Sequence, residues 1–185
     1  MSTASAGEPG FGPEITAIVD QHIALVPDYP KPGVLFRDIT PLLADGPAFA
    51  ALVDAFAERY RGRVDAVAGL ESRGFILGAP VAVALGVGMI TVRKAGRLPG
   101  EVIGADYSLE YGEARMEVRP STVARGQRVL VVDDVLATGG TAAAACRLME
   151  EAGAEVAGLG MLIELAELGG RARLTGRQVD SVVVV

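Results

Sequence analysis

The densest group of residues that could do chemistry lies at 129–141, which reads Val-Leu-Val-Val-Asp-Asp-Val-Leu-Ala-Thr-Gly-Gly-Thr. Its first four residues are apolar, too few for a helix, and suit a strand buried on both faces. The carboxylates Asp133 and Asp134 follow, and their oxygens can accept hydrogen bonds from ribose hydroxyls. The small-residue turn 137–141 then opens an alanine-rich helix, so its N–H groups, its two threonine hydroxyls and the helix N-terminus can bind a phosphate. The run therefore predicts a site for a phosphorylated sugar.

A simpler interpretation of this run also exists. Gly-Gly before a helix can be only a tight turn, and Asp at a strand end can be only a cap. The run is neither a Gly-Lys-[Ser/Thr] phosphate loop nor a G-x-G-x-x-G dinucleotide fingerprint. The coincidence of strand, acidic pair and turn within thirteen residues favours the ligand site.

Basic residues in two other segments suit phosphate oxygens. Arg73 lies in the turn 71–74, Glu-Ser-Arg-Gly, and its guanidinium is a fork of donors beside exposed turn amides. The alternative there is a surface salt bridge between Glu71 and Arg73, which is worth little. The segment 93–105 contains three glycines and three basic residues, and a long loop of this kind is usually a functional lid or disordered. A solvated basic loop is the alternative.

The elements that must position these residues follow from the periodicity of apolar residues. Half of the 185 residues are apolar, which suits one domain with a sizeable core. Strands are expected at 64–70, 87–92, 129–132, 156–165 and 179–185, a hairpin at 107–110 and 114–118, and helices at 13–26, 47–60, 75–84 and from the 137–141 turn to 152. The segment 28–40, with two prolines and a glycine, is expected to be irregular. Repeated strand–helix units predict an α/β fold with an open, mostly parallel sheet flanked by helices. The segments 71–74, 93–105 and 133–141 all leave strands at the carboxyl edge, where such sheets bind ligands.

Composition excludes several classes of function. The net charge of −6 argues against a nucleic-acid partner. No apolar run approaches the ~18 residues of a membrane span, and the N-terminus lacks the pattern of a signal peptide. A single cysteine fits a reducing cytoplasm. Residues 1–13 are rich in Ser, Ala, Gly and Pro, so we expect a disordered tail there and one domain over 14–185.

The run 129–141 resembles the signature by which type I phosphoribosyltransferases bind phosphoribosyl pyrophosphate (PRPP). The segments 28–40, 69–80, 92–100 and 107–112 are similar to the adenine phosphoribosyltransferases, so the resemblance covers about residues 14 to 170. It implies a glycosyltransferase of purine salvage that transfers the 5-phosphoribosyl group of PRPP to N9 of adenine, giving AMP and pyrophosphate. It also implies a type I phosphoribosyltransferase fold with a small N-terminal hood (residues 28–40), a flexible lid loop and a homodimer. Mg²⁺ would be held mainly by PRPP, with no direct protein ligand.

The resemblance also assigns roles to individual residues. Ribose and 5-phosphate binding falls to Asp133, Asp134, Ala137, Thr138, Gly139, Gly140 and Thr141. Pyrophosphate binding falls to Glu71, Ser72, Arg73, Gly74, Arg93, Lys94 and Arg97. Adenine binding falls to Leu35, Phe36 and Arg37 of the hood, through backbone groups and an apolar ring. The catalytic residues would be Glu110, Arg73 and Lys94, with Glu110 as the group that accepts a proton from the base.

Alternatives remain at this stage. Phe36 could be an ordinary core aromatic, and Glu110 an exposed strand carboxylate. The chain could bind PRPP without turnover, as a sensor, or act on a 6-oxo purine such as guanine, hypoxanthine or xanthine. A structural α/β domain whose turns are only turns is the simplest alternative.

Overall fold

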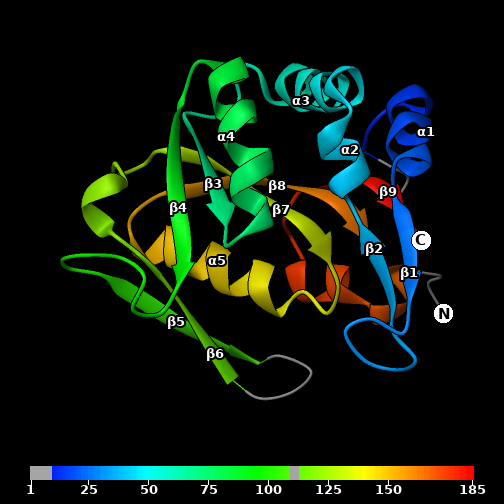
Figure 1. Ribbon diagram of the computed structural model, residues 1–185. Coiled ribbons are helices and arrows are strands. Elements are labelled where there is room, and N and C mark those ends of the chain that lie inside the picture. The colour runs from blue at the N-terminus through cyan, green and yellow to red at the C-terminus, as the bar shows by residue number, and fades with distance from the viewer. Residues whose placement is uncertain (1–9, 109–112) are drawn as a thin grey trace, which may run out of the picture.

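A computed structural model of the chain describes residues 10–108 and 113–185. Within them, a central sheet has the order β5-β6-β4-β3-β7-β8-β9 (Figure 1). Its strands are β3 (Ala66–Leu70), β4 (Gly88–Lys94), β5 (Ile103–Ser108), β6 (Glu113–Val118), β7 (Arg128–Leu136), β8 (Glu155–Glu164) and β9 (Val179–Val184). The five strands β4, β3, β7, β8 and β9 run parallel, and the β5–β6 hairpin joins β4 in antiparallel fashion. The predicted mostly parallel α/β sheet is therefore confirmed.

The sheet is covered on both faces because its central strands are apolar throughout. Leu130 and Val132 of β7 pack with α1 (Pro13–Gln21), α3 (Gly46–Tyr60) and α4 (Arg73–Leu85). Val129 and Val131 alternate to the other face and pack with α5 (Gly140–Glu151). This period of two is the geometry of a strand, and burial of both faces explains the unbroken apolar run in the sequence.

The N-terminal part of the fold differs from the sequence prediction. The first helix ends at Gln21 rather than at Val26, and the hood is irregular only in part, chiefly over 28–34. Instead β1 (Ala24–Pro27) pairs with β2 (Leu35–Asp38) as a separate antiparallel sheet, followed by α2 (Thr40–Ala44). The local helical pattern was misleading because pairing with a second segment, β2, decides the conformation of residues 24–27.

The bounds of other elements also differ from the sequence prediction. The strand β7 continues through the acidic pair to Leu136, because Asp133 still pairs with Met161 of β8. Arg93 and Lys94 belong to β4 and pair with β6, so the segment between β4 and β5 is only 95–102. The expected lid of residues 93–105 is shorter because the hairpin extends the sheet. Short 3-10 helices occur at η1 (Pro120–Thr122), η2 (Ala166–Leu168) and η3 (Gly170–Leu174).

Gly10 and Phe11, which fall within the expected disordered tail, contact the rest of the fold. Phe11 is buried, and its ring centroid lies 4.7 Å from that of Phe56. The Gly10 N–H donates to the Ser181 carbonyl at 3.2 Å. Residues 1–9 lie outside the described residues. In the described ranges, every helix is too short or too polar to cross a membrane.

Candidate active site

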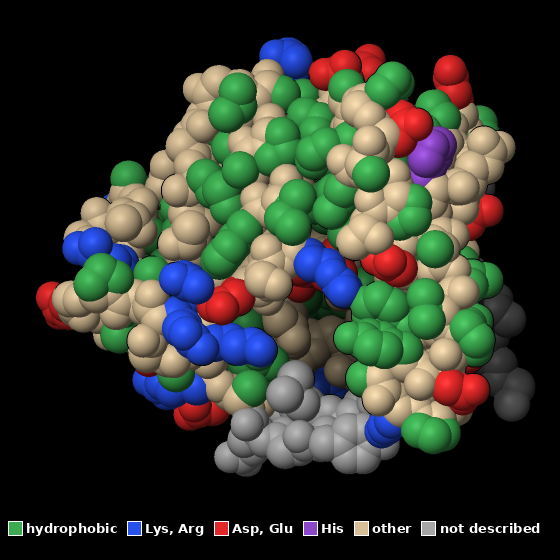
Figure 2. Space-filling view, in the orientation of Figure 1, with side chains coloured by type: hydrophobic (Ala, Val, Ile, Leu, Met, Phe, Trp, Pro, Cys, Tyr) green, Lys and Arg blue, Asp and Glu red, His purple; other side chains and the backbone are tan. Residues whose placement is uncertain are grey.

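The carboxyl ends of β4, β3 and β7 bring the predicted segments to one edge of the sheet. Leu70 pairs with Val92, and Gly69 pairs with Val132, so the turn 71–74 lies between Arg93 and the acidic pair. On this face Figure 2 shows a hollow between a group of basic side chains on the β4–β6 side and apolar side chains on the hood side. The sequence prediction of a common edge is confirmed.

Arg73 connects the hood to the acidic pair. Its Nη1 donates to Asp134 Oδ2 at 2.8 Å, and its guanidinium carbon lies 4.9 Å from the centroid of the Phe36 ring. The Asp134 side chain is only 14% exposed. The hydrogen bond from the guanidinium fixes the direction of this carboxylate. The predicted alternative, a salt bridge between Arg73 and Glu71, is not the arrangement found.

Glu71 instead holds the end of β4. It accepts hydrogen bonds from Arg93 Nε at 3.2 Å and from the Lys94 N–H at 2.8 Å. Burial acts to raise the pKa of Glu71, but these two donors lower it below the ordinary value. Arg93 also donates to the Arg97 carbonyl at 3.2 Å. The side chains of Lys94 and Arg97 are exposed at this edge, so they are accessible to an anion.

Asp133 lies beside Gly74 in the first turn of α4. Its Oδ1 accepts from the Asp134 N–H at 2.9 Å. Burial and the neighbouring charge of Asp134 raise its pKa well above the ordinary value of a carboxyl. A Cβ at Gly74 would lie 2.6 Å from the Val132 carbonyl oxygen and 3.1 Å from Asp133 Oδ1. Glycine at position 74 is therefore what lets the helix begin beside the acidic pair. Ser72 precedes α4 as its N-cap, after a cis Glu71–Ser72 peptide bond.

The small-residue turn forms the N-terminus of α5. Gly139 is the N-cap residue with φ of 78°, a conformation that glycine adopts without strain, and Gly140 begins the helix. Among the described residues, no side chain caps this terminus. Its first N–H groups are thus available to an anion. Ala137, Thr138 and Thr141 are half-buried around it.

A cleft of about 310 Å³ lies between the hood and Arg73, lined by Val26, Tyr29, Phe36, Asp38 and Arg73. The Tyr29 and Phe36 rings meet edge to face at 5.0 Å between centroids. Because side chains alternate along β2, Phe36 and Asp38 face the cleft together, while Leu35 and Arg37 are not among its lining residues. Leu35 is 47% exposed.

Comparisons with known proteins agree with this geometry. Residues 42–183 match the model of the phosphoribosyl transferase domain. The chain is 57% identical over 168 residues to an adenine phosphoribosyltransferase of Clavibacter michiganensis, covering 91% of this chain and 95% of that one. The chain belongs to the adenine phosphoribosyltransferase family. Its structure is similar to that of the family member from Thermoanaerobacter pseudethanolicus, with a TM-score of 0.88 and 42% identity over 92% of this chain and 99% of that one. It is also similar to the family member from Saccharomyces cerevisiae complexed with D-2,5-dideoxy-2,5-imino-altritol 1,6-bisphosphate and adenine, with a TM-score of 0.88 and 37% identity over 91% and 98% of the two chains.

Several residues at the site of this adenine phosphoribosyltransferase fold were missed by sequence reasoning. Val26, Tyr29 and Asp38 line the hood cleft, and only the alternation of β2 could have indicated Asp38. A second cleft of about 390 Å³ lies between β5 and α5; Tyr107, Gly140, Arg147 and Arg173 are among its lining residues. The two arginines lie outside every recognisable motif.

Glu110 lies outside the described residues. Within the described ranges, no three His, Cys, Asp or Glu side chains gather as metal ligands.

Proposed function

We propose that this chain transfers the 5-phosphoribosyl group of PRPP to N9 of adenine, giving AMP and pyrophosphate in purine salvage. The observation that carries the proposal is the junction at Arg73, where an aromatic hood cleft meets an acidic pair beside the open N-terminus of α5. The yeast relative, complexed with adenine and a bisphosphate sugar analogue, supports both halves of the ligand.

The proposed chemistry is a displacement at C1 of the ribose. Adenine stacks on Phe36 in the hood cleft, the α5 N-terminus binds the 5-phosphate, and Asp133 and Asp134 accept hydrogen bonds from the ribose hydroxyls. N9 forms a bond to C1 as the bond from C1 to pyrophosphate breaks. The proton lost by the base goes to Glu110. Arg73, Arg93, Lys94 and Arg97, with the Glu71–Gly74 turn, surround the departing pyrophosphate and balance its charge.

Mg²⁺ belongs to the same proposal, and the acidic pair fits it. Mg²⁺ prefers oxygen ligands, keeps several waters and is often shared with substrate phosphates. Asp133 lies beside the charge of Asp134, and a cation arriving with PRPP would offset that repulsion. The two carboxylates would hold the ion mainly through its waters, while PRPP supplies the direct oxygen ligands. When bound, the ion neutralises charge on the leaving group.

We further propose a homodimer in the cytoplasm. The outer face of α4 supports the dimer, because Ile76 and Val83 there are 46% and 80% exposed. Exposed apolar side chains grouped on one helix face favour an interface. Sedimentation of the purified protein tests the proposed homodimer, with Val83→Lys as the comparison. A monomeric wild-type protein would exclude the homodimer.

The test of function is turnover of a panel of bases. Purified protein with Mg²⁺, PRPP and adenine should yield AMP, while guanine, hypoxanthine and xanthine should react poorly. Binding of PRPP without turnover of any base would instead support a sensor. The double variant Asp133→Asn with Asp134→Asn should lose activity, and turnover at the wild-type rate would remove the role of the acidic pair.

A further inference from the structure

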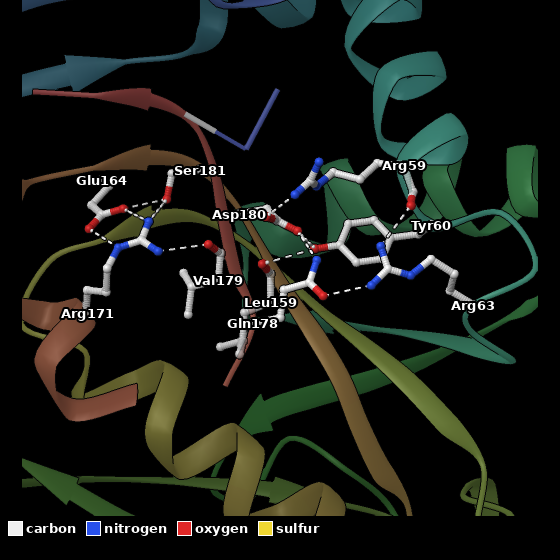
Figure 3. A network of polar contacts seen from close by, with 10 residues as sticks. All are labelled: Arg59, Tyr60, Arg63, Leu159, Glu164, Arg171, Gln178, Val179, Asp180 and Ser181. Carbon is white, nitrogen blue, oxygen red and sulfur yellow. Dashed lines mark hydrogen bonds and ion pairs between the residues drawn. The ribbon is translucent and has the colours of Figure 1, made fainter. Parts of the chain in front are cut away.

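Two polar networks lie on opposite faces of β9 (Figure 3). On one face Asp180 accepts from Arg59 at 2.5 Å and from Tyr60 at 2.6 Å, both on α3. On the other face Ser181 donates to Glu164 Oε2 at 2.6 Å, and Glu164 is paired with Arg171. Adjacent residues of a strand point to opposite faces, so one strand carries both networks.

Arg171 is held at each of its three guanidinium nitrogens. Nε donates to Glu164 Oε1 at 2.8 Å, and Nη1 donates to the Val179 carbonyl at 2.8 Å. Nη2 donates to Glu164 Oε2 and, at 3.3 Å, to Ser181 Oγ. Glu164 is only 5% exposed, so its charge depends on this guanidinium. The planar fork of arginine can satisfy these acceptors together, and the single ammonium of lysine cannot.

This network lies directly behind the phosphate-binding turn. Arg171 follows Gly170, the first residue of η3, and the Gly170 backbone touches the turn. A Cβ at Gly170 would overlap the Ala137 carbonyl and lie 2.8 Å from the Gly139 nitrogen, and a Cβ at Gly139 would overlap the Gly170 carbonyl. Glu164 is also the cross-strand neighbour of Leu136, the residue before the turn.

We propose that Arg171 and Glu164 are positioning residues for the phosphate end of the substrate. They hold Gly170 against Ala137 and Gly139, so the N–H groups at the start of α5 keep a fixed spacing before the ligand arrives. Donors fixed in advance bind an anion without the cost of ordering the loop. The proposal rests on the proposed function, because it takes the bound anion to be the 5-phosphate of PRPP or AMP.

The test compares Arg171→Lys with a control in the network on the opposite face of β9, Arg59→Lys. Arg171→Lys should raise KM for PRPP about tenfold, the lower end of what an outer-shell partner contributes at other ligand sites. Calorimetry should show AMP binding weakened by a similar factor, with adenosine binding and KM for adenine unchanged. Arg59→Lys removes the fork from the other network of β9, so it should lower Tm while leaving both KM values unchanged.

The outcomes separate the two claims. A folded Arg171→Lys with unchanged KM for PRPP, or an equal rise in Arg59→Lys, would overturn the positioning role. Should Arg171→Lys fail to fold, Ser181→Ala removes one hydroxyl of the network and should raise KM for PRPP in the same direction; an unchanged value would count against the proposal. Wild-type protein that forms no AMP would refute the proposed function. In that case, weaker binding of ribose 5-phosphate to Arg171→Lys than to wild type would still support the positioning role, and equal binding would overturn it.

Discussion

The guanidinium of Arg73 lies 4.9 Å from the centroid of the Phe36 ring, which joins the first turn of α4 to the hood. The same side chain donates to Asp134 on β7. One residue therefore links the cleft proposed for the base to the residues proposed for the sugar. Because a cation over an aromatic face and a stacked base compete for the same surface, binding of adenine would move Arg73 relative to the ring.

The first prediction concerns Phe36. Phe36→Leu removes the aromatic face, and stacking of a base on an aromatic ring is worth about 1–3 kcal/mol. KM for adenine should rise by about tenfold or more, while KM for PRPP stays unchanged. Phe11→Leu is the matched control. The guanidinium of Arg59 lies 5.6 Å from the centroid of the Phe11 ring, and Phe11 does not line the hood cleft. Steady-state kinetics measure both values, and an unchanged KM for adenine in Phe36→Leu would return Phe36 to the role of a packing residue.

The second prediction concerns the charge of Asp133. Burial and the charge of Asp134 raise the pKa of Asp133 in the folded protein. The contribution of Asp133 to the free energy of unfolding is therefore complete below the ordinary Asp pKa of about 3.9, and it is lost as pH rises through the raised pKa of the folded protein. Asp133→Asn has no such loss. The variant should therefore melt higher than wild type at pH 8, by at least about 2 °C, and the difference should shrink toward pH 4.

Asp133→Asn should also lower the activity of the enzyme. The same variant should have greatly reduced kcat/KM for PRPP at every pH, because the amide cannot replace the carboxylate toward ribose hydroxyls and Mg²⁺. Thermal melts over this pH range check the first part. A variant that melts below wild type at pH 8 would contradict the account of the buried charge.

The third prediction concerns Glu71. Glu71→Gln keeps the size of the side chain but removes the charge that holds Arg93 and the Lys94 N–H. Charge-assisted hydrogen bonds contribute about 1.5–3 kcal/mol, so kcat/KM for PRPP should fall about tenfold or more. Asp65→Asn serves as control, because its ion pair with Arg128 at 2.6 Å is exposed and lies at the opposite end of β7. A fall of equal size in Asp65→Asn would mean that the effect is not local.

The fourth prediction concerns Glu110. A general base must be ionised, so the wild-type kcat should fall as pH drops below the pKa of Glu110 in the complex. Glu110→Gln should reduce kcat by about 10²- to 10⁴-fold and remove this acidic limb. The pH profile of kcat for both proteins checks it, and an acidic limb retained in Glu110→Gln would assign the proton to another group.

Local sequence was enough for the elements whose conformation their own residues specify. The apolar run before Asp133 required a buried strand, and the Gly139–Gly140 turn required a helix start, because both signals depend on residues a few positions apart. The same holds for the order of strands and helices that gives the parallel sheet. Residues 24–27 failed this rule, since a four-residue strand there exists only through its pairing with β2.

The sequence by itself determined the family and the set of residues at the sheet edge, since both follow from short motifs in a fixed order. Only the tertiary structure decided which partners those residues have. Glu71 pairs with Arg93 rather than Arg73, Arg73 pairs with Asp134, and Gly170 backs the turn at Gly139. Such pairs join strands and helices that are distant in the chain, and packing of the whole sheet sets their distances, so no local spacing could specify them.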